Sequence, residues 1–194
     1  MAAKPKYYWD SCIFFALLNG EADVHGQAVM DGIMDMASDF DNHKIVLISS
    51  VMTKTEVYDY KLKTQYARDE FTSRFQRDNF LWVAQDERVS DKSRAIRSFY
   101  GKKGITLDAG DCVHLATAIL YEADVFYTLD GSGDNPKPNA LLPLNNDVAG
   151  YQLRVEKPHG PQGTLFSRSP TAVSAAIGQR HHAPLTKRRK PSTH

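Results

Sequence analysis

The sequence predicts an α/β fold, in which a central parallel sheet lies between two layers of helices in a three-layer α/β/α sandwich. Short apolar runs that suit strands alternate with longer stretches whose apolar residues recur at helical spacing. The clearest run, residues 44–49, is almost continuously apolar, as expected of a parallel strand that is covered on both faces. This alternation favours parallel strands joined by crossover helices, and 194 residues with 42% hydrophobic content suffice for one such domain.

The first half of the chain contains two predicted strands and three predicted helices. An aromatic run forms a short strand that ends just before Asp10, and an amphipathic stretch precedes the continuous apolar strand. The expected elements are strands at residues 6–9 and 44–49 and helices at residues 11–18, 25–40 and 51–63.

The second half repeats the alternation. Gly104 ends a basic helix, and an alanine- and leucine-rich helix then leads into a short apolar strand that ends on Asp130. The expected elements are helices at residues 66–77, 91–104 and 112–120 and strands at residues 80–84, 125–130 and 151–155.

Four acidic residues share one kind of position in this predicted fold. Asp10 and Asp130 end strands, and Glu56 and Asp111 lie early in helices near the same edge of the sheet. Ligands of open α/β sheets bind at this edge, beyond the carboxyl ends of the strands. Four carboxylates there would raise one another's pKa values unless a cation lay among them, and oxygen ligands suit Mg²⁺ or Mn²⁺ better than zinc. The sequence therefore predicts a cation site suited to phosphodiester cleavage.

Ordinary structural roles compete for several of these polar residues. Glu56 follows Thr53 by three residues, which is the spacing of a capping box. A carboxylate in the first turn of a helix, such as Asp111, is favoured by the helix dipole alone. Asp108 is expected to cap the same helix. His114, one turn after Asp111, is interpreted as a helix-packing histidine in preference to a catalytic one.

Charge is distributed unevenly along the chain. Residues 1–153 carry a formal charge of −6, and residues 154–194 carry +7. We therefore expect one domain at residues 1–156 and a basic, disordered C-terminal tail at residues 157–194, rich in Pro, Gly, Ser and Thr. The basic cluster at residues 187–190 either contacts nucleic-acid phosphates or only keeps the protein soluble.

Neither a membrane segment nor a disulfide framework is indicated. The chain has no run of about 18 apolar residues, and the apolar run at residues 13–18 lacks a preceding basic segment and a cleavage site. Cys12 and Cys112 lie outside any metal-ligand spacing and in apolar surroundings, so we expect buried free thiols. These observations predict a soluble protein of the reducing cytoplasm.

Four short motifs resemble those of PIN-domain ribonucleases, a group that includes the VapC-type toxins of bacteria and archaea. The motifs are YWDS at residues 8–11, Glu56 in the helix after an apolar strand, DCVHLATA at residues 111–118 and YTLD at residues 127–130. Their order and spacing carry the resemblance, which covers about residues 6–156.

The resemblance implies a Mg²⁺- or Mn²⁺-dependent endoribonuclease that hydrolyses single-stranded RNA. Its acidic ligand set, and its catalytic residues, would be Asp10, Glu56, Asp111 and Asp130, with Thr128 as a neighbour that hydrogen-bonds the carboxylates or water. The resemblance also implies a homodimer. In the toxin branch it implies an antitoxin protein, a segment of which lies across the active site.

The sequence departs from the family pattern after the fourth motif. The family often places a further Asp and a Phe there, whereas the turn at residues 131–133 comes before Asp134 and no Phe follows. Asp134 either supplies an extra carboxylate or only shapes the loop. The long basic tail is also unusual for a compact toxin.

Three other classes of protein stay open. A haloacid-dehalogenase-like phosphatase needs a DxD pair at the first strand, but Asp10 is followed by Ser11 and Cys12. A receiver domain needs adjacent acids near the first strand and a Lys after the last, and the sequence has neither. A non-catalytic PIN-like module that binds RNA or protein would keep the fold without the activity.

Overall fold

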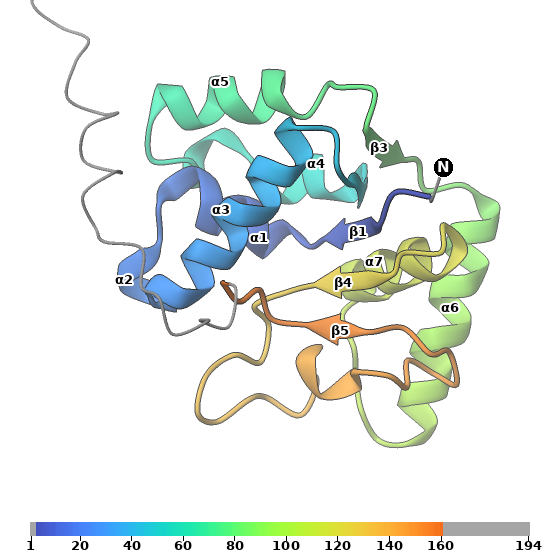
Figure 1. Ribbon diagram of the computed structural model, residues 1–194. Helices are drawn as coiled ribbons and strands as arrows, with labels where there is room; N and C mark the ends of the chain where they lie inside the picture. The colour runs from blue at the N-terminus through green and yellow to red at the C-terminus, as the bar shows by residue number, and fades with distance from the viewer. Residues whose placement is uncertain (1–2, 161–194) are drawn as a thin grey trace, which may run out of the picture. The chain divides into compact units, whose positions relative to one another are not determined.

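The computed structural model describes residues 3–160 and contains a parallel sheet between two layers of helices (Figure 1), which confirms the predicted fold class. All pairings in the five-stranded sheet are parallel, and the strand order is β3-β2-β1-β4-β5. The strands are β1 (Lys6–Trp9), β2 (Val46–Ser50), β3 (Phe80–Val83), β4 (Val125–Tyr127) and β5 (Val155–Glu156).

Helices cover both faces of this sheet. In Figure 1, α3 crosses in front of the strands, whereas α7 lies behind β4. The front layer contains α1 (Ser11–Asn19), α2 (Ala22–His25), α3 (Gln27–Asp41) and α5 (Gln65–Arg74), and the back layer contains α6 (Glu87–Lys102) and α7 (Ala109–Leu120). The short helices are α4 (Met52–Glu56), η1 (Asp59–Lys61) and η2 (Leu142–Leu144). None of the helices in the described residues is long and apolar enough to span a membrane.

The core is divided by the sheet into two apolar clusters. Successive strand residues point to opposite faces, so Tyr8 packs with α6 and α7 while Trp9 packs with α1, α3 and α5. Both side chains are fully buried. The central strand β1 is therefore buried on both faces of the sheet. The same was predicted for residues 44–49, and in β2 Leu47 and Ile48 lie in opposite clusters.

The strand order places a topological switch point between β1 and β4. The chain builds the sheet outward from β1 through β2 to β3, and then returns to add β4 and β5 on the other side of β1. In open α/β sheets such a switch point opens a crevice at the carboxyl ends of the strands. Asp10 follows β1 directly and Thr128 follows β4 directly, so both residues lie at this crevice.

The predicted helix at residues 51–63 was wrong, because α4 ends at Glu56. Val57 leaves the helical conformation with φ −88° and ψ 79°, and its side chain is buried with the front-layer core. The capping box was also wrong. Val51 precedes the helix without a side-chain cap, and the Thr53 hydroxyl lies inside α4, 2.8 Å from the Ser49 hydroxyl.

Other predicted bounds differ from the structure. The helix expected at residues 91–104 begins earlier, as α6 at Glu87, and the strand expected at residues 125–130 ends at Tyr127, three residues before Asp130. The helix expected at residues 25–40 is α3, which begins at Gln27 because Gly26, with a φ of +85°, separates it from α2. Glycine adopts this left-handed region without steric cost. The last strand was expected at residues 151–155 but is only Val155–Glu156, because Tyr151 instead forms an isolated bridge with Val148.

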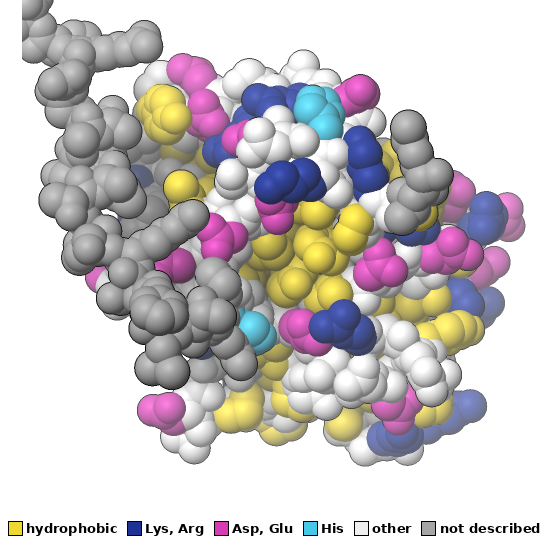
Figure 2. Space-filling view, viewed as in Figure 1, with side chains coloured by type: hydrophobic (Ala, Val, Ile, Leu, Met, Phe, Trp, Pro, Cys, Tyr) yellow, Lys and Arg dark blue, Asp and Glu magenta, His cyan; other side chains and the backbone are white. Residues whose placement is uncertain are grey.

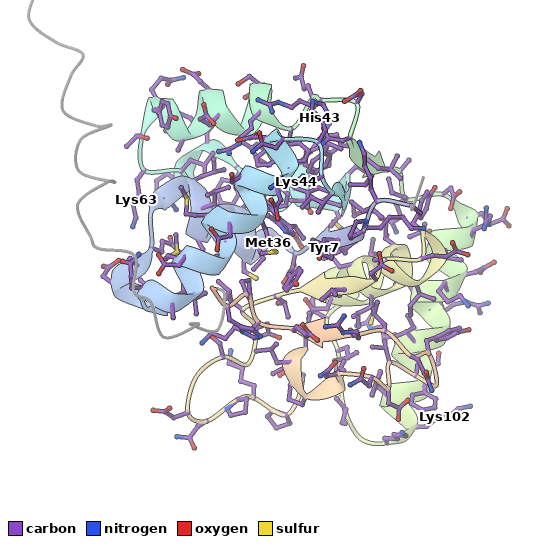
Figure 3. The ribbon with its side chains drawn as sticks, in the orientation of Figure 1. Tyr7, Met36, His43, Lys44, Lys63 and Lys102 are labelled. Atoms are coloured by element: carbon purple, nitrogen blue, oxygen red, sulfur yellow. The ribbon has the colours of Figure 1, made fainter. Side chains whose placement is uncertain are left out.

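Apolar side chains remain partly exposed on the front face (Figure 2), where they are surrounded by charged residues. Tyr7 and Met36 lie near the middle of this face, between α3 and the strands (Figure 3). The rings of Tyr7 and Tyr127 pack edge to face with centroids 5.3 Å apart. Helices therefore cover this part of the sheet incompletely.

The chain continues past β5 and packs against α3. The Gly160 N–H donates a hydrogen bond to the Ala28 carbonyl at 2.9 Å. The His159 backbone passes so close to Gly32 that a Cβ atom at position 32 would meet it at 2.4 Å. The tail was predicted to be disordered from residue 157, but His159 and Gly160 are held in these contacts with α3. The rest of the tail, with its basic cluster at residues 187–190, lies outside the described residues.

Candidate functional site

Asp10 is the most tightly held carboxylate at the switch point. It is 6% exposed and precedes α1 as its N-cap, so its Oδ1 accepts the Ser11 N–H at 2.7 Å. Its Oδ2 accepts the Thr128 hydroxyl at 2.7 Å and the Cys12 thiol at 3.2 Å. These three hydrogen bonds fix the orientation of the Asp10 carboxylate at the end of the central strand.

Glu56 is fixed by a buried relay from the sheet. His114 Nε2 lies 2.8 Å from Glu56 Oε2, and His114 Nδ1 lies 2.6 Å from the Tyr8 hydroxyl. The Tyr8 oxygen already accepts the Ser50 N–H at 3.0 Å, so its own proton points to Nδ1. His114 Nε2 therefore carries a proton and donates a hydrogen bond to Glu56 Oε2.

Burial and neighbouring charges act in opposite directions on this pair. Burial raises the pKa of Glu56, but the hydrogen bond from His114, together with smaller effects of its surroundings, outweighs it and the pKa is lowered. Burial lowers the pKa of His114, but the hydrogen bond to Glu56 and the charge of Asp10 outweigh it and the pKa is raised. Glu56 is therefore held as a carboxylate.

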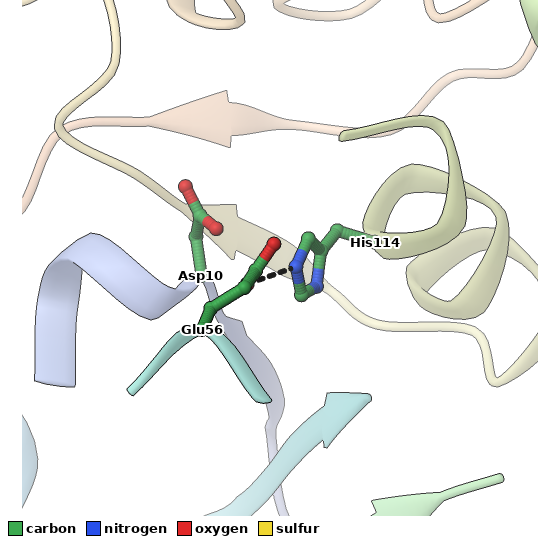
Figure 4. A group of neighbouring side chains, drawn as sticks. All are labelled: Asp10, Glu56 and His114. Atoms are coloured by element: carbon green, nitrogen blue, oxygen red, sulfur yellow. Dashed lines mark hydrogen bonds and ion pairs between the residues drawn. The ribbon is translucent and has the colours of Figure 1, made fainter. Parts of the chain in front are cut away.

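Asp10, Glu56 and His114 form the tightest group of metal-binding side chains in the described residues, with one ligand atom from each within 4.8 Å of the others (Figure 4). Both ring nitrogens of His114 are engaged, by Tyr8 and by Glu56. His114 thus has no free lone pair for a metal and orients Glu56. His114 was expected to be a helix-packing residue. It is buried, as such a residue would be, and it also makes the hydrogen bond to Glu56.

Gly110 makes the close approach of Glu56 possible. A Cβ atom at this position, in the first turn of α7, would lie 3.0 Å from Glu56 Oε1 and 3.2 Å from Asp108 Oδ1. The predicted cap of α7 is confirmed, because Asp108 Oδ1 accepts the Gly110 N–H at 2.8 Å. A hydrogen atom at Gly110 therefore leaves room for the two carboxylates on α4 and α7.

Asp111 lies in the first turn of α7, half-buried at the same edge. Burial and the negative charges of Asp10 and Asp130 raise its pKa from 3.8 to about 6. Burial disfavours the charged form of the carboxyl group, and the neighbouring carboxylates add to this effect. The charges of Asp10 and Asp130 therefore act on Asp111, although Asp111 is not part of the group formed by Asp10, Glu56 and His114.

Asp130 follows β4 and turns toward the next loop. Its N–H donates to the Thr128 hydroxyl oxygen at 3.0 Å, and its Oδ2 accepts the Leu141 N–H at 2.9 Å. Burial raises the pKa of Asp130, the Leu141 hydrogen bond opposes this, and the charge of Asp10 adds to it. The fully buried Thr128 thus links the two acids, donating to Asp10 and accepting from Asp130.

Asp134 and Cys12 lie in different surroundings. Asp134 lies exposed in the loop after β4 and makes no hydrogen bond or ion pair within residues 3–160. Cys12 is a free thiol, as expected, but it is only half-buried and its surroundings are only partly apolar. It packs against the front-layer core, while its Sγ lies 3.2 Å from Asp10 Oδ2 and accepts the Leu129 N–H at 3.1 Å. Burial and the Asp10 charge raise the pKa of this thiol.

The donor set of the site suits a hard divalent cation. Asp10 and Glu56 present carboxylate oxygens to one point, and Asp111 and Asp130 add negative charge around it. Burial and the repulsion from Asp10 and Asp130 both raise the pKa of Asp111, and a bound cation would oppose both effects. Oxygen ligands of this kind fit Mg²⁺ or Mn²⁺.

Comparison with known proteins gives one family and a fold. The PIN domain family matches residues 7–132. One similar solved structure is VapBC2 from Rickettsia felis, which was crystallised with a DNA fragment from the promoter. The sequence identity is 13% and the TM-score is 0.53, and the match covers 77% of this chain and 98% of the VapBC2 chain. FitAcB from Neisseria gonorrhoeae is 16% identical with a TM-score of 0.43, and the match covers 64% and 87% of the two chains. No curated protein matches the chain.

Proposed function

Since the chain belongs to the PIN-domain family, we propose that it is an endoribonuclease that hydrolyses phosphodiester bonds of single-stranded RNA with Mg²⁺ or Mn²⁺. The observation that carries the proposal is the meeting of acids from separate elements at the switch point. Asp10 after β1 and Glu56 on α4 bring carboxylate oxygens within 4.8 Å of each other. Burial, together with the charges of Asp10 and Asp130, raises the pKa of Asp111 on α7 to about 6. The one ion pair that any of these four acids makes in the described part of the chain is the pair of Glu56 with His114.

Each residue of the proposed site has a distinct task. Asp10 and Glu56 would hold the cation, and Asp111 and Asp130 would complete its negative surroundings. When bound, the cation would neutralise phosphate charge and lower the pKa of the attacking water. The hydrogen bonds that Thr128 and His114 make would keep the Asp10 and Glu56 oxygens directed at the cation.

The partners follow from the resemblance to VapC-type toxins. RNA is the proposed substrate, and an antitoxin protein with a segment across the acidic edge is the proposed inhibitor. A homodimer is proposed as the assembly, and the partly exposed front face around Tyr7 and Met36 offers it an apolar surface. Sedimentation of the purified protein tests the dimer. Inhibition by the product of a short neighbouring reading frame tests the antitoxin.

The direct test is cleavage of a mixed single-stranded RNA by purified protein with Mn²⁺, Mg²⁺ or EDTA. Asp10→Asn and Asp111→Asn each remove a charge while keeping the shape of the side chain. Asp35→Asn is the matched control, because Asp35 is exposed on α3 and has no hydrogen bond or ion pair in residues 3–160. Asp134→Asn, measured in parallel, decides whether that loop residue contributes to the site.

We expect cleavage that requires the cation, disappears in both site variants and persists in Asp35→Asn. Absence of cleavage by folded, cation-loaded wild-type protein on every RNA tried would instead support a non-catalytic RNA- or protein-binding module. Equal cleavage by wild type and Asp10→Asn would point to a contaminating nuclease.

A further inference from the structure

A hollow lies beside the acidic edge, on the other side of α7. It has a volume of about 420 Å³ and is formed by α6 together with the first residues of α4 and α7. Ser93, Arg94 and Arg97 line it from α6, and Met52 and Ala109 close it. We call this hollow the arginine pocket.

The arginine pocket is one helix width from the acidic group. Ala109 and Val113 both line the pocket and are four residues apart, so they share one face of α7. Asp111 lies midway between them, about 200° around the helix from either, and therefore faces away from the pocket. Because a helix with its side chains is about 10 Å wide, the pocket and the acids are separated by roughly that distance.

All of the charged side chains that line the pocket are cationic, which favours an anionic ligand. Two of the residues that line it are arginines, and none is Asp or Glu. Arg97 makes no ion pair within the described residues. Arg94 has one, a 3.6 Å contact with Asp91 in which both side chains are mostly exposed. Such a surface pair contributes little, so both guanidinium groups are available to a ligand.

A hydroxyl adds a donor to the arginines. Ser93 lines the pocket, and its hydroxyl has no hydrogen-bond partner in the described part of the chain. The hydroxyl is not among the fully buried side-chain atoms that lack a partner, so it is open to the pocket. A ligand oxygen beside Arg97 could accept from it, and guanidinium groups bind phosphate oxygens in a bidentate geometry.

We propose that the arginine pocket binds a backbone phosphate of the RNA substrate, next to the phosphodiester that is cleaved. The inference rests on the proposed function for its substrate class. Successive phosphates of a stacked strand are roughly 3.4 Å apart along its axis, so a separation of about 10 Å places the bound phosphate within about three nucleotides of the cut. Ser93, Arg94 and Arg97 would thereby set the register of the strand across the acidic edge.

The first test measures binding without cleavage. Fluorescence anisotropy of a labelled single-stranded RNA, with EDTA present, compares wild type with the double variant Arg94→Gln/Arg97→Gln. The matched control is Arg88→Gln/Lys102→Gln, which removes the same charge from the same helix outside the pocket. Melting curves establish that all three proteins are folded.

We expect the pocket variant to bind RNA about tenfold more weakly and the control less than twofold more weakly. The slope of log Kd against log salt should fall by about 0.7 in the pocket variant, the contribution of one phosphate of a single strand. Equal weakening in both double variants, or no RNA binding by wild type, would overturn the inference.

The second test separates this inference from the nuclease itself. In cleavage assays the pocket variant should raise KM and leave kcat within about twofold, because the pocket does not touch the reacting phosphate. Wild-type protein that binds RNA through the pocket and never cuts would contradict the nuclease alone. Cleavage with the same KM in wild type and pocket variant would contradict the pocket alone.

Discussion

His114 donates a hydrogen bond from Nε2 to Glu56 Oε2 at 2.8 Å, across 58 residues of sequence. Its other nitrogen is fixed by Tyr8, which the Ser50 backbone fixes in turn. A chain of hydrogen bonds thus runs from the centre of the sheet to a carboxylate of the candidate site. The orientation of Glu56 therefore depends on the core and not only on its own short helix.

Tyr8→Phe should weaken the site without removing any carboxylate. The change keeps the stacked contact with Phe126 but leaves the Ser50 N–H and His114 Nδ1 without a partner. Unfolding should become easier by about 1 to 3 kcal/mol, the usual cost of buried groups left unpaired. The specific readout is the ¹⁵N NMR spectrum of His114, which should show a protonated Nε2 in wild type and a mixture of tautomers in the variant. An unchanged spectrum would contradict the relay.

Gly110→Ala should disturb Glu56 more than it disturbs α7. Alanine is the better helix former by about 1 kcal/mol, but its Cβ would lie 3.0 Å from Glu56 Oε1 and push that carboxylate away. We expect Mn²⁺ affinity, measured by calorimetry, to fall about tenfold while the melting temperature changes little. Gly101→Ala is the control, since a Cβ there meets nothing within 4 Å. Unchanged Mn²⁺ affinity in Gly110→Ala would show that Glu56 tolerates the methyl group.

Asp111→Asn should stabilise the cation-free protein at neutral pH. A pKa raised to about 6 means that the folded protein holds this proton more tightly than the unfolded chain, whose value is near 3.8. The carboxylate therefore becomes destabilising as pH rises from about 4 to 6, and this effect stays constant above pH 6. Discounted for partial exposure, it amounts to about 1 kcal/mol. Denaturant unfolding in EDTA should give this gain at pH 7.5 and none at pH 3.5; equal gains at both would contradict the pKa assignment.

The affinity for a cation should rise with pH over the range in which the stability of the cation-free protein falls. Below pH 6 a proton occupies Asp111, and a cation must displace it. Affinity for Mn²⁺ should therefore fall by up to about tenfold per pH unit below 6 and level off above it. Calorimetry between pH 5 and pH 8 measures this directly, and protons released on binding should be detectable near pH 6. A flat profile over this range would mean that Asp111 is not part of the cation site.

The four acids were identifiable from sequence because each depends on local pattern. Strands end where apolar runs end, and parallel strands bring those ends together, so Asp10 and Asp130 could be placed without coordinates. Glu56 was harder, because a capping box with Thr53 explained it equally well until the structure put that hydroxyl against Ser49.

The supporting residues depend on tertiary contacts, which one sequence does not reveal. Tyr8 and Gly110 have no local pattern that distinguishes them from ordinary core and helix residues. His114 did carry a signal, since its position three residues after Asp111 puts both on neighbouring parts of α7. Cys12 was misread because the residues around it in sequence are apolar, whereas its thiol lies against the Asp10 carboxylate.

Thr128→Val should separate the positioning of the acids from their charge. Valine matches the shape of threonine, so the core around this fully buried side chain should stay filled. The variant removes the donor to Asp10 Oδ2 and the acceptor of the Asp130 N–H, which frees both acids to move. We expect cleavage to fall about a hundredfold, with a loss of about 1 to 2 kcal/mol in stability.

Thr128→Ser keeps the hydroxyl and should retain most of the activity, even though it leaves a small cavity. If Thr128→Ser were as inactive as Thr128→Val, packing of the methyl group, and not the hydrogen bonds between the two strand ends, would be what the site requires.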